Sequence, residues 1–554
     1  MLKNVFDSLW RKVPWFAMSL VWGCLLYGKQ GLHKQIDDLV RAKAGDVPFA
    51  GISDDAGFLR RVTLDLTGNI PTAGEVTTFL ADKSADKRTK LMDRLISGDP
   101  FAAHWTERFS VMLLERLDQG KVSKEEWAEF LKQTLRKKPL WDVMIRQMIE
   151  ANGQGAGRPA MKFLGTADHH AMTENIARLL LGMDLTCAKC HDHPSVNEWK
   201  QAHYWGLFAY LNQTKQATHK KEKKVYLVEG LAGKKVEFES VFDLEKMSTG
   251  PRLPNREEVE IPQFEKGEKY EKAAEQGLPA VPKFRTRERL AKDLTDKEND
   301  LFSRNSVNRI WFLLMGRGLS HPLDQMHGKN SPSHPKLLEL LAGEFVSHGF
   351  DLKWLLREIM LSETYQRSSR LPEGVTKVEP DSYRVASPKG LTAEQLLRAV
   401  LRATGNTEQA KALKVDPEAE KFDRKGYFTG SNTMLPPSLE EMEAIFIQTF
   451  GQPSGEAEVD FSPGINKSLF LMNDRLIQHW LKPLGNNLVA RLGKLETTDA
   501  IARGMYLSVL SRLPEEEEQD WLTDYLEMNQ QRRSAALGDL AWALLNSAEF
   551  RFNH

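Results

Sequence analysis

Cysteine is nearly absent from this sequence. The 554 residues include only three cysteines, at positions 24, 187 and 190, and three cannot build a disulfide framework. A surplus of either charge is missing too, because 76 basic residues balance 76 acidic ones. The sequence therefore lacks both the basic surplus of nucleic-acid-binding proteins and the acidic tail of solvating segments, and we expect no nucleic-acid partner.

Long hydrophobic runs are also missing, except near the N-terminus. Three basic residues, Lys3, Arg11 and Lys12, precede an uncharged apolar run over 13–28, which is the order of an export signal. The run is slightly short for a membrane span. Cys24 lies in a segment that loosely resembles a lipoprotein cleavage box, although a residue within a cleaved signal explains it equally well. We predict that residues 1–30 form a signal, or a membrane or lipid anchor, and that the protein is exported to the periplasm or cell envelope.

The rest of the sequence predicts a mainly α-helical fold, with two helical domains joined by a small β-containing insert. A chain of this length is expected to form two or three domains. Helical periodicity fills residues 31–213 and resumes over 284–554, whereas residues 214–283 differ in texture. There "KKVYLVEGLAGKKVEFESV" alternates around a glycine-containing turn, which predicts a β-hairpin, and a linker rich in Pro, Gly and charge follows.

Two of the expected helices begin with capping boxes. In this motif a hydroxyl and a glutamate three residues later satisfy free amides at the helix start. The pairs are Thr72 with Glu75 and Ser123 with Glu126. The helix after Ser123 is expected to carry four apolar residues on one face: Trp127, Phe130, Leu131 and Leu135.

Two of the three cysteines lie in the stretch "LTCAKCHDHP", Leu185 to Pro194. Cys187, Cys190 and His191 form the pattern C-x-x-C-H, the attachment signature of haem c. Two thiols at this spacing reach the two vinyl groups of one porphyrin, and the adjacent imidazole can bind its iron. Haem c is attached outside the cytoplasm, which agrees with the expected export signal. The pattern predicts one covalent haem.

Zinc is the alternative cofactor for the same stretch. Cys187, Cys190, His191 and His193 are all ligand types that zinc accepts, but they crowd into seven residues, so a ligand from elsewhere would be needed. A thiol–disulfide redox pair is disfavoured because the helical pattern "TENIARLLLGMDL" precedes the motif where a strand would be expected. Asp192 or His193 could instead orient a ligand's free ring nitrogen, and Asp192 could equally cap the next turn.

A haem also needs apolar walls, and its iron takes a sixth ligand in many sites. Five aromatic residues after the motif are candidates for the walls, although a core helix explains them equally well: Trp199, Tyr204, Trp205, Phe208 and Tyr210. Among the nearby methionines and histidines, we expect His169 or His170 to supply the sixth ligand.

With these motifs identified, the chain resembles a known family. "FLRRVTLDLTGNIPTAGEVTTFLAD" and "ARLLLGMDLTCAKCHDHPSVNEWKQAHYWGLFAYL" resemble the planctomycete cytochrome domain. "LFSRNSVNRIWFLLMGRGLSHPLDQM" and the ending "DLAWALLNSAEFRFNH" resemble the uncharacterised domain that habitually follows it. The resemblance covers about residues 35–554 apart from the insert, and it implies an exported protein of planctomycetes, verrucomicrobia or relatives.

The resemblance also implies roles for individual residues. Cys187, Cys190 and His191 match the family's proposed haem site and Asp192–Pro194 its flanking signature, whereas Ser195 stands where members often have an aromatic residue. Two motifs match the second domain, for which no activity is established: Asn308, Arg309, Gly316, Arg317 and Gly318, then Ser333, His334 and Pro335. Structural roles explain both motifs as well as a functional site would, with Gly316 and Gly318 ending a helix and Ser333 capping the next.

Together these patterns favour an exported c-type cytochrome-like protein that transfers electrons to or from an unidentified redox partner. The alternative is a non-redox cell-surface or polysaccharide-associated scaffold, stapled by zinc at the same stretch. No residue is singled out as catalytic. The acidic stretches "EEMEAIF" and "PEEEEQD" predict solvated helix faces or helix starts rather than paired carboxylates, so a hydrolase ranks last.

Overall fold

The computed structural model describes residues 30–43, 45, 47–165, 168–242, 245–265, 267–413, 422–457 and 464–554. Within them the fold is mainly α-helical, and the strands form only small two-stranded sheets. The predicted fold class is confirmed to that extent. None of the helices in these ranges is long and apolar enough to cross a membrane. The signal or anchor predicted at residues 1–30, with Cys24, lies outside the described ranges apart from Gln30 and stays a prediction.

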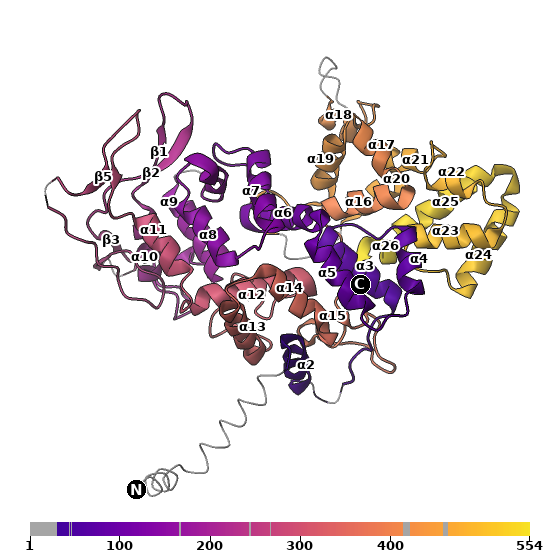
Figure 1. The fold of residues 1–554 in the computed structure, drawn as a ribbon, viewed down its shortest axis with the longest axis horizontal. Helices are drawn as coiled ribbons and strands as arrows, with labels where there is room; N and C mark the ends of the chain where they lie inside the picture. The colour runs from indigo at the N-terminus through magenta and orange to yellow at the C-terminus, as the bar shows by residue number, and fades with distance from the viewer. Residues whose placement is uncertain are drawn as a thin grey trace, which may run out of the picture.

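The helices pack around two hydrophobic cores (Figure 1). The first core draws on residues from Leu32 to Tyr383. Its helices are α2 (Leu32–Ala42), α3 (Asp55–Thr67), α4 (Ala73–Ala81), α5 (Lys87–Ser97), α6 (Asp99–Leu114), α7 (Lys124–Arg136), α8 (Trp141–Glu150), α9 (His169–Asn175), α10 (Gln201–Leu211), α11 (Thr286–Leu294), α12 (Asp300–Met315), α13 (Pro335–Ser347), α14 (Leu352–Leu361) and α15 (Glu363–Gln366).

The second core draws on residues 393–550, and Leu64 and Ile70 join it from the first half of the chain. Its helices are α16 (Ala393–Thr404), α17 (Thr407–Ala412), α18 (Arg424–Thr429), α19 (Leu439–Phe450), α20 (Ile465–Asn473), α21 (Arg475–Trp480), α22 (Leu488–Leu492), α23 (Thr498–Val509), α24 (Glu516–Met528), α25 (Arg533–Asn546) and α26 (Ala548–Arg551). The change of core therefore falls between 383 and 393, whereas the sequence favours a change of domain at 283/284.

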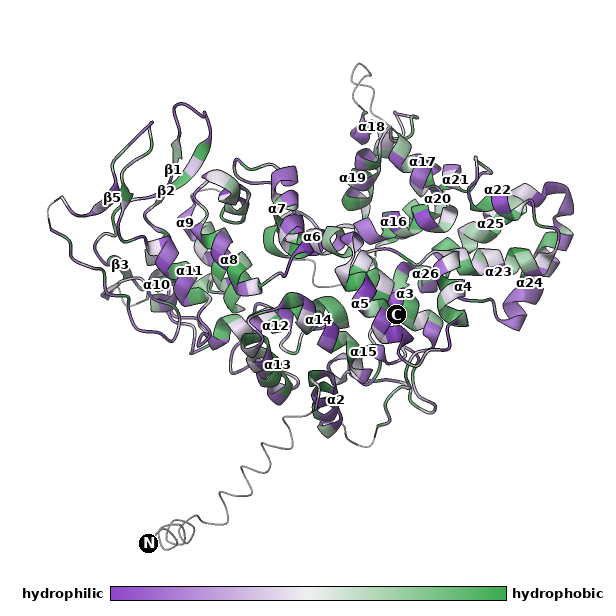
Figure 2. Cartoon of the chain, viewed as in Figure 1, coloured by the Kyte–Doolittle hydropathy of each residue, from purple (hydrophilic) through white to green (hydrophobic). Residues whose placement is uncertain are grey.

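Helix α12 explains why the first core runs past residue 283. Most of its residues are buried, Trp311 and Val307 completely, and a helix that is buried on every side must be enclosed by others. It packs against α13 and α14 and against the π-helical turn Ile176–Leu180. Hydrophobic residues are frequent along these helices (Figure 2). The segment after the insert thus completes the core that the first helices begin.

The two motifs that carry the resemblance over residues 308–335 have structural roles. The Asn308 side chain donates to Ser320 O (2.8 Å) and accepts from Ser320 N (2.9 Å), while Arg309 pairs with Asp324 (3.0 Å). Gly316 ends α12 at φ 79°, the left-handed conformation that favours glycine. The prediction for Ser333 is wrong, because α13 takes His334 as its N-cap and no side chain caps it.

Both predicted capping boxes are present. Thr72 and Glu75 exchange hydrogen bonds at the start of α4, and Ser123 and Glu126 do so at the start of α7. Along α7, Trp127, Leu131 and Leu135 are buried, and Phe130 packs half-buried against them. Short-range chemistry and helical periodicity thus specify these elements correctly.

Strands β1 to β6 lie between 214 and 282, in the segment predicted to contain β-structure. They are β1 (Thr214–Thr218), β2 (Val225–Glu229), β3 (Val236–Glu239), β4 (Lys246–Thr249), β5 (Tyr270–Lys272) and β6 (Val281–Pro282). The two strands of the predicted hairpin, β2 and β3, do form, but their pairing is wrong: β2 pairs with β1 and β3 with β4, all antiparallel. A further pair, β7 (Lys389–Gly390) with β8 (Phe552–Asn553), joins the end of the chain to the segment between the cores.

Candidate functional site

The C-x-x-C-H stretch forms a tight turn at the surface. Residues Cys187–Lys189 are a 3₁₀ helix, and both Cys190 N (3.2 Å) and His191 N (3.4 Å) donate to Cys187 O. Side chains three residues apart eclipse one another in such a turn, so the two sulfurs share one side. Both cysteines are exposed, and neither forms a disulfide.

His191 is held in one tautomer. Its Nδ1 lies 2.6 Å from Asp192 O, and because a carbonyl can only accept, Nδ1 carries the proton. In the neutral imidazole Nε2 is then the nitrogen with the free lone pair, and it has no partner among the described residues. A ring whose other nitrogen donates to a backbone carbonyl is the usual arrangement of a metal-binding histidine.

The side chains of Asp192 and His193 hydrogen-bond to residues that follow in the turn, and neither contacts a nitrogen of the His191 ring. Asp192 accepts from Gln201 N (2.8 Å) and from Lys200 Nζ (2.9 Å). Burial alone would raise the pKa of Asp192, but these two hydrogen bonds outweigh it and the pKa is lowered. His193 Nδ1 accepts from Val196 N (3.0 Å). Among the side chains that the structure describes, no three of His, Cys, Asp or Glu lie close enough to hold a metal ion, so zinc would require rearrangement here.

His170 lies among the aromatic side chains of α10. Its Nδ1 is 2.6 Å from Tyr204 Oη, and its ring centroid is 4.8 Å from that of Phe208 and 5.9 Å from that of Trp205. Trp205 donates in turn to Lys189 O (3.2 Å), inside the motif. Burial and Lys189 lower the pKa of His170, which favours the neutral imidazole, the form that binds metals.

The other predicted residues of the pocket lie elsewhere. His169 Nε2 donates to Thr214 O (2.6 Å) and is therefore occupied. Tyr210 donates to Asp293 on α11 (2.8 Å), and buried Trp199 packs between the rings of His193 and His327. The structure thus brings Tyr204, Trp205 and Phe208 together around His170 and leaves Trp199 and Tyr210 apart from it.

The β-containing insert supplies side chains that the sequence analysis missed. Val241 N donates to Cys190 O (3.1 Å), and the Phe242 ring lies 4.9 Å from the His191 ring. Phe238 on β3 stacks on Trp205 at 5.9 Å. Val241 and Phe242 are 58% and 78% exposed, so an uncovered apolar surface adjoins both the second cysteine and the histidine.

A separate cavity of about 640 Å³ is lined by three glutamates, two of which pair with arginines. Glu394 pairs with Arg116 (2.7 Å) and Glu107 with Arg398, while Glu443 has no partner among the described residues. Burial and the charge of Glu107 raise the pKa of Glu443 to about 7. The prediction that "EEMEAIF" is a solvated face is therefore wrong for Glu443, whereas "PEEEEQD" does start α24.

Two domain models match the chain. Residues 35–216 match PSCyt2, a protein of unknown function (DUF1549), and residues 286–526 match PSD1, a protein of unknown function (DUF1553). The chain carries these two domains in this order. The order agrees with the planctomycete pairing that the sequence resembles. Neither a curated protein nor a solved structure matches the chain. The PSD1 match begins at α11, so the two matched domains share the first core.

Proposed function

We propose that Cys187 and Cys190 carry one covalently attached haem, that His191 is its proximal ligand, and that the protein exchanges electrons with a redox partner. One observation carries the proposal: two free, exposed thiols share one side of a turn whose adjacent histidine engages Nδ1 with a backbone carbonyl and leaves Nε2 without a partner among the described residues. The export predicted from residues 1–30 agrees with attachment outside the cytoplasm.

The chain's own residues supply what attachment requires. Each free thiol can add its S–H across a vinyl group, so that a C–S bond forms and the hydrogen goes to the neighbouring vinyl carbon, with no oxidant needed. Haem, when bound, supplies a one-electron redox centre. Val241 and Phe242 offer apolar surface beside Cys190 and His191, and covering it on attachment removes it from water.

His170 is the sixth ligand that the hydrogen bonding favours. Its Nδ1 is engaged by Tyr204, which leaves Nε2, the nitrogen farther from the backbone, unbound. His169 has the opposite arrangement, because Thr214 O occupies its Nε2. Trp205 links the rings around His170 to Lys189, so His170 and the motif both contact the Trp205 side chain.

The test is expression of the full chain in a host with haem c maturation machinery. We expect a Soret band and a mass gain of one haem, both lost in the Cys187→Ser/Cys190→Ser double variant, whereas the exposed His348→Gln control keeps them. A colourless wild type with stoichiometric zinc would select the zinc-stapled scaffold instead. A colourless wild type with neither group contradicts both cofactor assignments.

The sixth ligand is tested on the same holoprotein. His170→Gln is expected to convert a six-coordinate, low-spin absorption spectrum into a five-coordinate, high-spin one. His169→Gln is the matched control, and it should leave the spectrum unchanged. The reverse result would assign the ligand to His169, and no change in either variant would exclude both histidines.

A further inference from the structure

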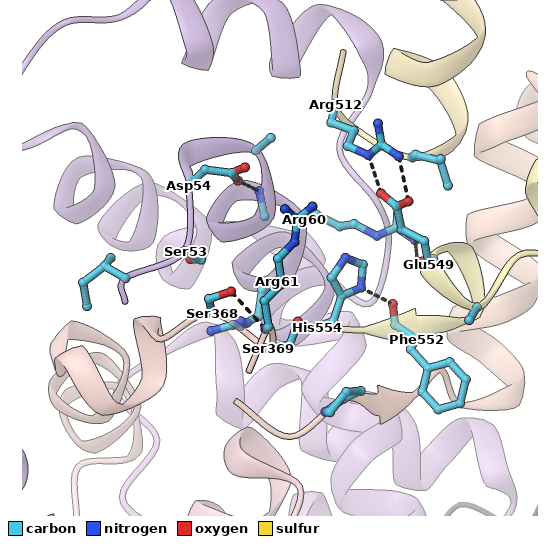
Figure 3. A pocket seen from close by; sticks show the side chains of 17 residues that line it. Ser53, Asp54, Arg60, Arg61, Ser368, Ser369, Arg512, Glu549, Phe552 and His554 are labelled. Carbon is cyan, nitrogen blue, oxygen red and sulfur yellow. Dashed lines mark hydrogen bonds and ion pairs between the residues drawn. The ribbon is translucent and has the colours of Figure 1, made fainter. Parts of the chain in front are cut away.

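A cavity of about 720 Å³ lies far along the chain from the C-x-x-C-H motif, where α3 meets residues 548–554 (Figure 3). Four segments line it: the loop and first turns at the start of α3, the loop after α15, the loop after α23, and the residues after α25. Its size is typical of small-molecule sites. Because the segments come from both family domains, the cavity exists only in the assembled chain.

Two buried arginines face this cavity without a carboxylate partner. Arg60 and Arg61 are 2% and 4% exposed, and neither forms an ion pair with any described residue. Arg60 donates only to neutral acceptors, among them Phe550 O (2.9 Å) and Ser511 Oγ (3.2 Å). Burial, only partly offset by the charge of Glu549, lowers the pKa of Arg60 to about 10. A buried charge without a counter-charge is costly, so the site favours an anion.

The acidic groups near the cavity are already engaged. Glu549 is bound at both oxygens by Arg512, at 2.6 and 2.9 Å. Asp54 accepts from Gly57 N (2.7 Å) as the N-cap of α3. Asp65, behind Arg61, accepts from Tyr365 Oη (2.8 Å) and from two further donors. Glu549 and Asp65 are thus paired with Arg512 and Lys389, and Asp54 is the one described acidic side chain lining the cavity that has no cationic partner.

Uncommitted donors also reach the cavity. Arg61 uses NH1 for Tyr365 O, while its Nε and NH2 make no hydrogen bond to the protein and are not among the fully enclosed polar atoms. Since Arg61 lines the cavity, these two nitrogens are open to it. Ser368 and Ser369 line the same walls and bring their hydroxyls to the site, whereas the Ser53 hydroxyl is enclosed by the protein.

We propose that this cavity binds a small molecule through an oxyanion, a carboxylate or a phosphate group, with Arg61 as the direct donor and Arg60 as the buried charge behind it. A guanidinium offers parallel N–H donors that match both oxyanions. The serine hydroxyls add hydrogen bonds to the rest of the ligand. The site is independent of the haem motif.

Binding is tested by calorimetry on the full chain at neutral pH and low salt, with inorganic phosphate and galacturonate as probes and galactose as the uncharged counterpart. We expect at least one anion to bind and galactose not to bind. Arg61→Met should weaken binding about 10- to 100-fold, the usual loss for a hydrogen bond to a charged group. Ser369→Phe, which fills the cavity from a loop, should abolish it.

The matched control is Arg304→Met, a half-buried arginine paired with Glu339 outside the cavity, which should bind as the wild type does. Binding of phosphate alone or of galacturonate alone supports the proposal and identifies which oxyanion the site takes. If Arg61→Met fails to fold, Ser369→Phe still decides. The proposal is overturned if neither anion binds, if galactose binds as tightly as galacturonate, or if the folded variants bind as the wild type does.

Discussion

Glu443 differs from the two glutamates that precede it. Glu440 is exposed and Glu441 pairs with Arg424 (2.9 Å) at the surface, while Glu443 turns toward Glu107 and Glu394 in the 640 Å³ cavity. A run of glutamates at the start of α19 has no periodicity that marks one of them as buried. The burial arises because α19 packs against α16.

The raised pKa of Glu443 predicts a pH-dependent stability. In the unfolded chain the carboxyl has a pKa near 4.5, and in the folded protein near 7, so the folded state binds the proton more tightly. The stabilisation from protonated Glu443 is complete below pH 4.5 and is lost as the pH rises through 7. Glu443→Gln should therefore be more stable than the wild type by about 1–3 kcal/mol at pH 8, and nearly equal to it at pH 4.5.

The measurement is urea unfolding of both proteins at pH 4.5 and pH 8. Glu441→Gln is the control, since its carboxylate lies at the surface and is paired, and it should gain nothing at pH 8. An equal stability difference at both pH values for Glu443→Gln would contradict the raised pKa.

Helix starts and strand pairing differ in how far the sequence alone specifies them. The Ser123–Glu126 box depends on atoms within four residues, and it was predicted correctly. The strands that pair with β2 and β3 were predicted wrongly, because a turn signal indicates only that the chain reverses. Packing decides the partner here: Leu227 N donates to Asn152 O, outside the insert, and Gln201 on α10 donates to Glu239 O at the end of β3.

Removing one cap should weaken one element by a defined amount. Ser123→Ala deletes the hydroxyl that accepts from Glu126 N (3.1 Å), and we expect a loss of about 1 kcal/mol in the free energy of unfolding. Urea titration followed by circular dichroism measures it. Thr77→Ala, an exposed mid-helix change on α4, should stay within about 0.5 kcal/mol, and a loss as large as that of Ser123→Ala would contradict the capping role.

At the scale of the whole molecule, a buried polar network joins the two cores. Asp65 on α3 accepts from Lys389 Nζ (2.6 Å) on β7 and from Asn553 Nδ2 (2.8 Å) on β8. Lys389 also donates to Leu314 O (2.6 Å) near the end of α12. The network ties α3, α12 and β8 together, and it gives Asn553 a structural role.

Breaking this network should destabilise the whole protein. Lys389→Met leaves the buried Asp65 carboxylate without its cationic partner, and we expect a loss of about 3–5 kcal/mol, as for other buried pairs that lose one member. Equilibrium urea unfolding measures the loss. Lys377→Met removes an exposed lysine paired with Glu379 and should change stability by less than about 1 kcal/mol; similar losses in the two variants would show that the network adds nothing.

The sequence by itself determined the mainly helical fold, the capped helix starts, the β-containing insert and the cysteine–histidine spacing of the candidate haem site. Each of these depends on interactions within a few residues, which leave a pattern in the sequence. Only the tertiary structure decided that Phe242 lies against His191, that His170 rather than His169 keeps Nε2 unbound, and that Arg60 and Arg61 face a cavity at the end of the chain. These contacts join residues up to 490 positions apart, and hydrophobic burial brings them together without any local signature.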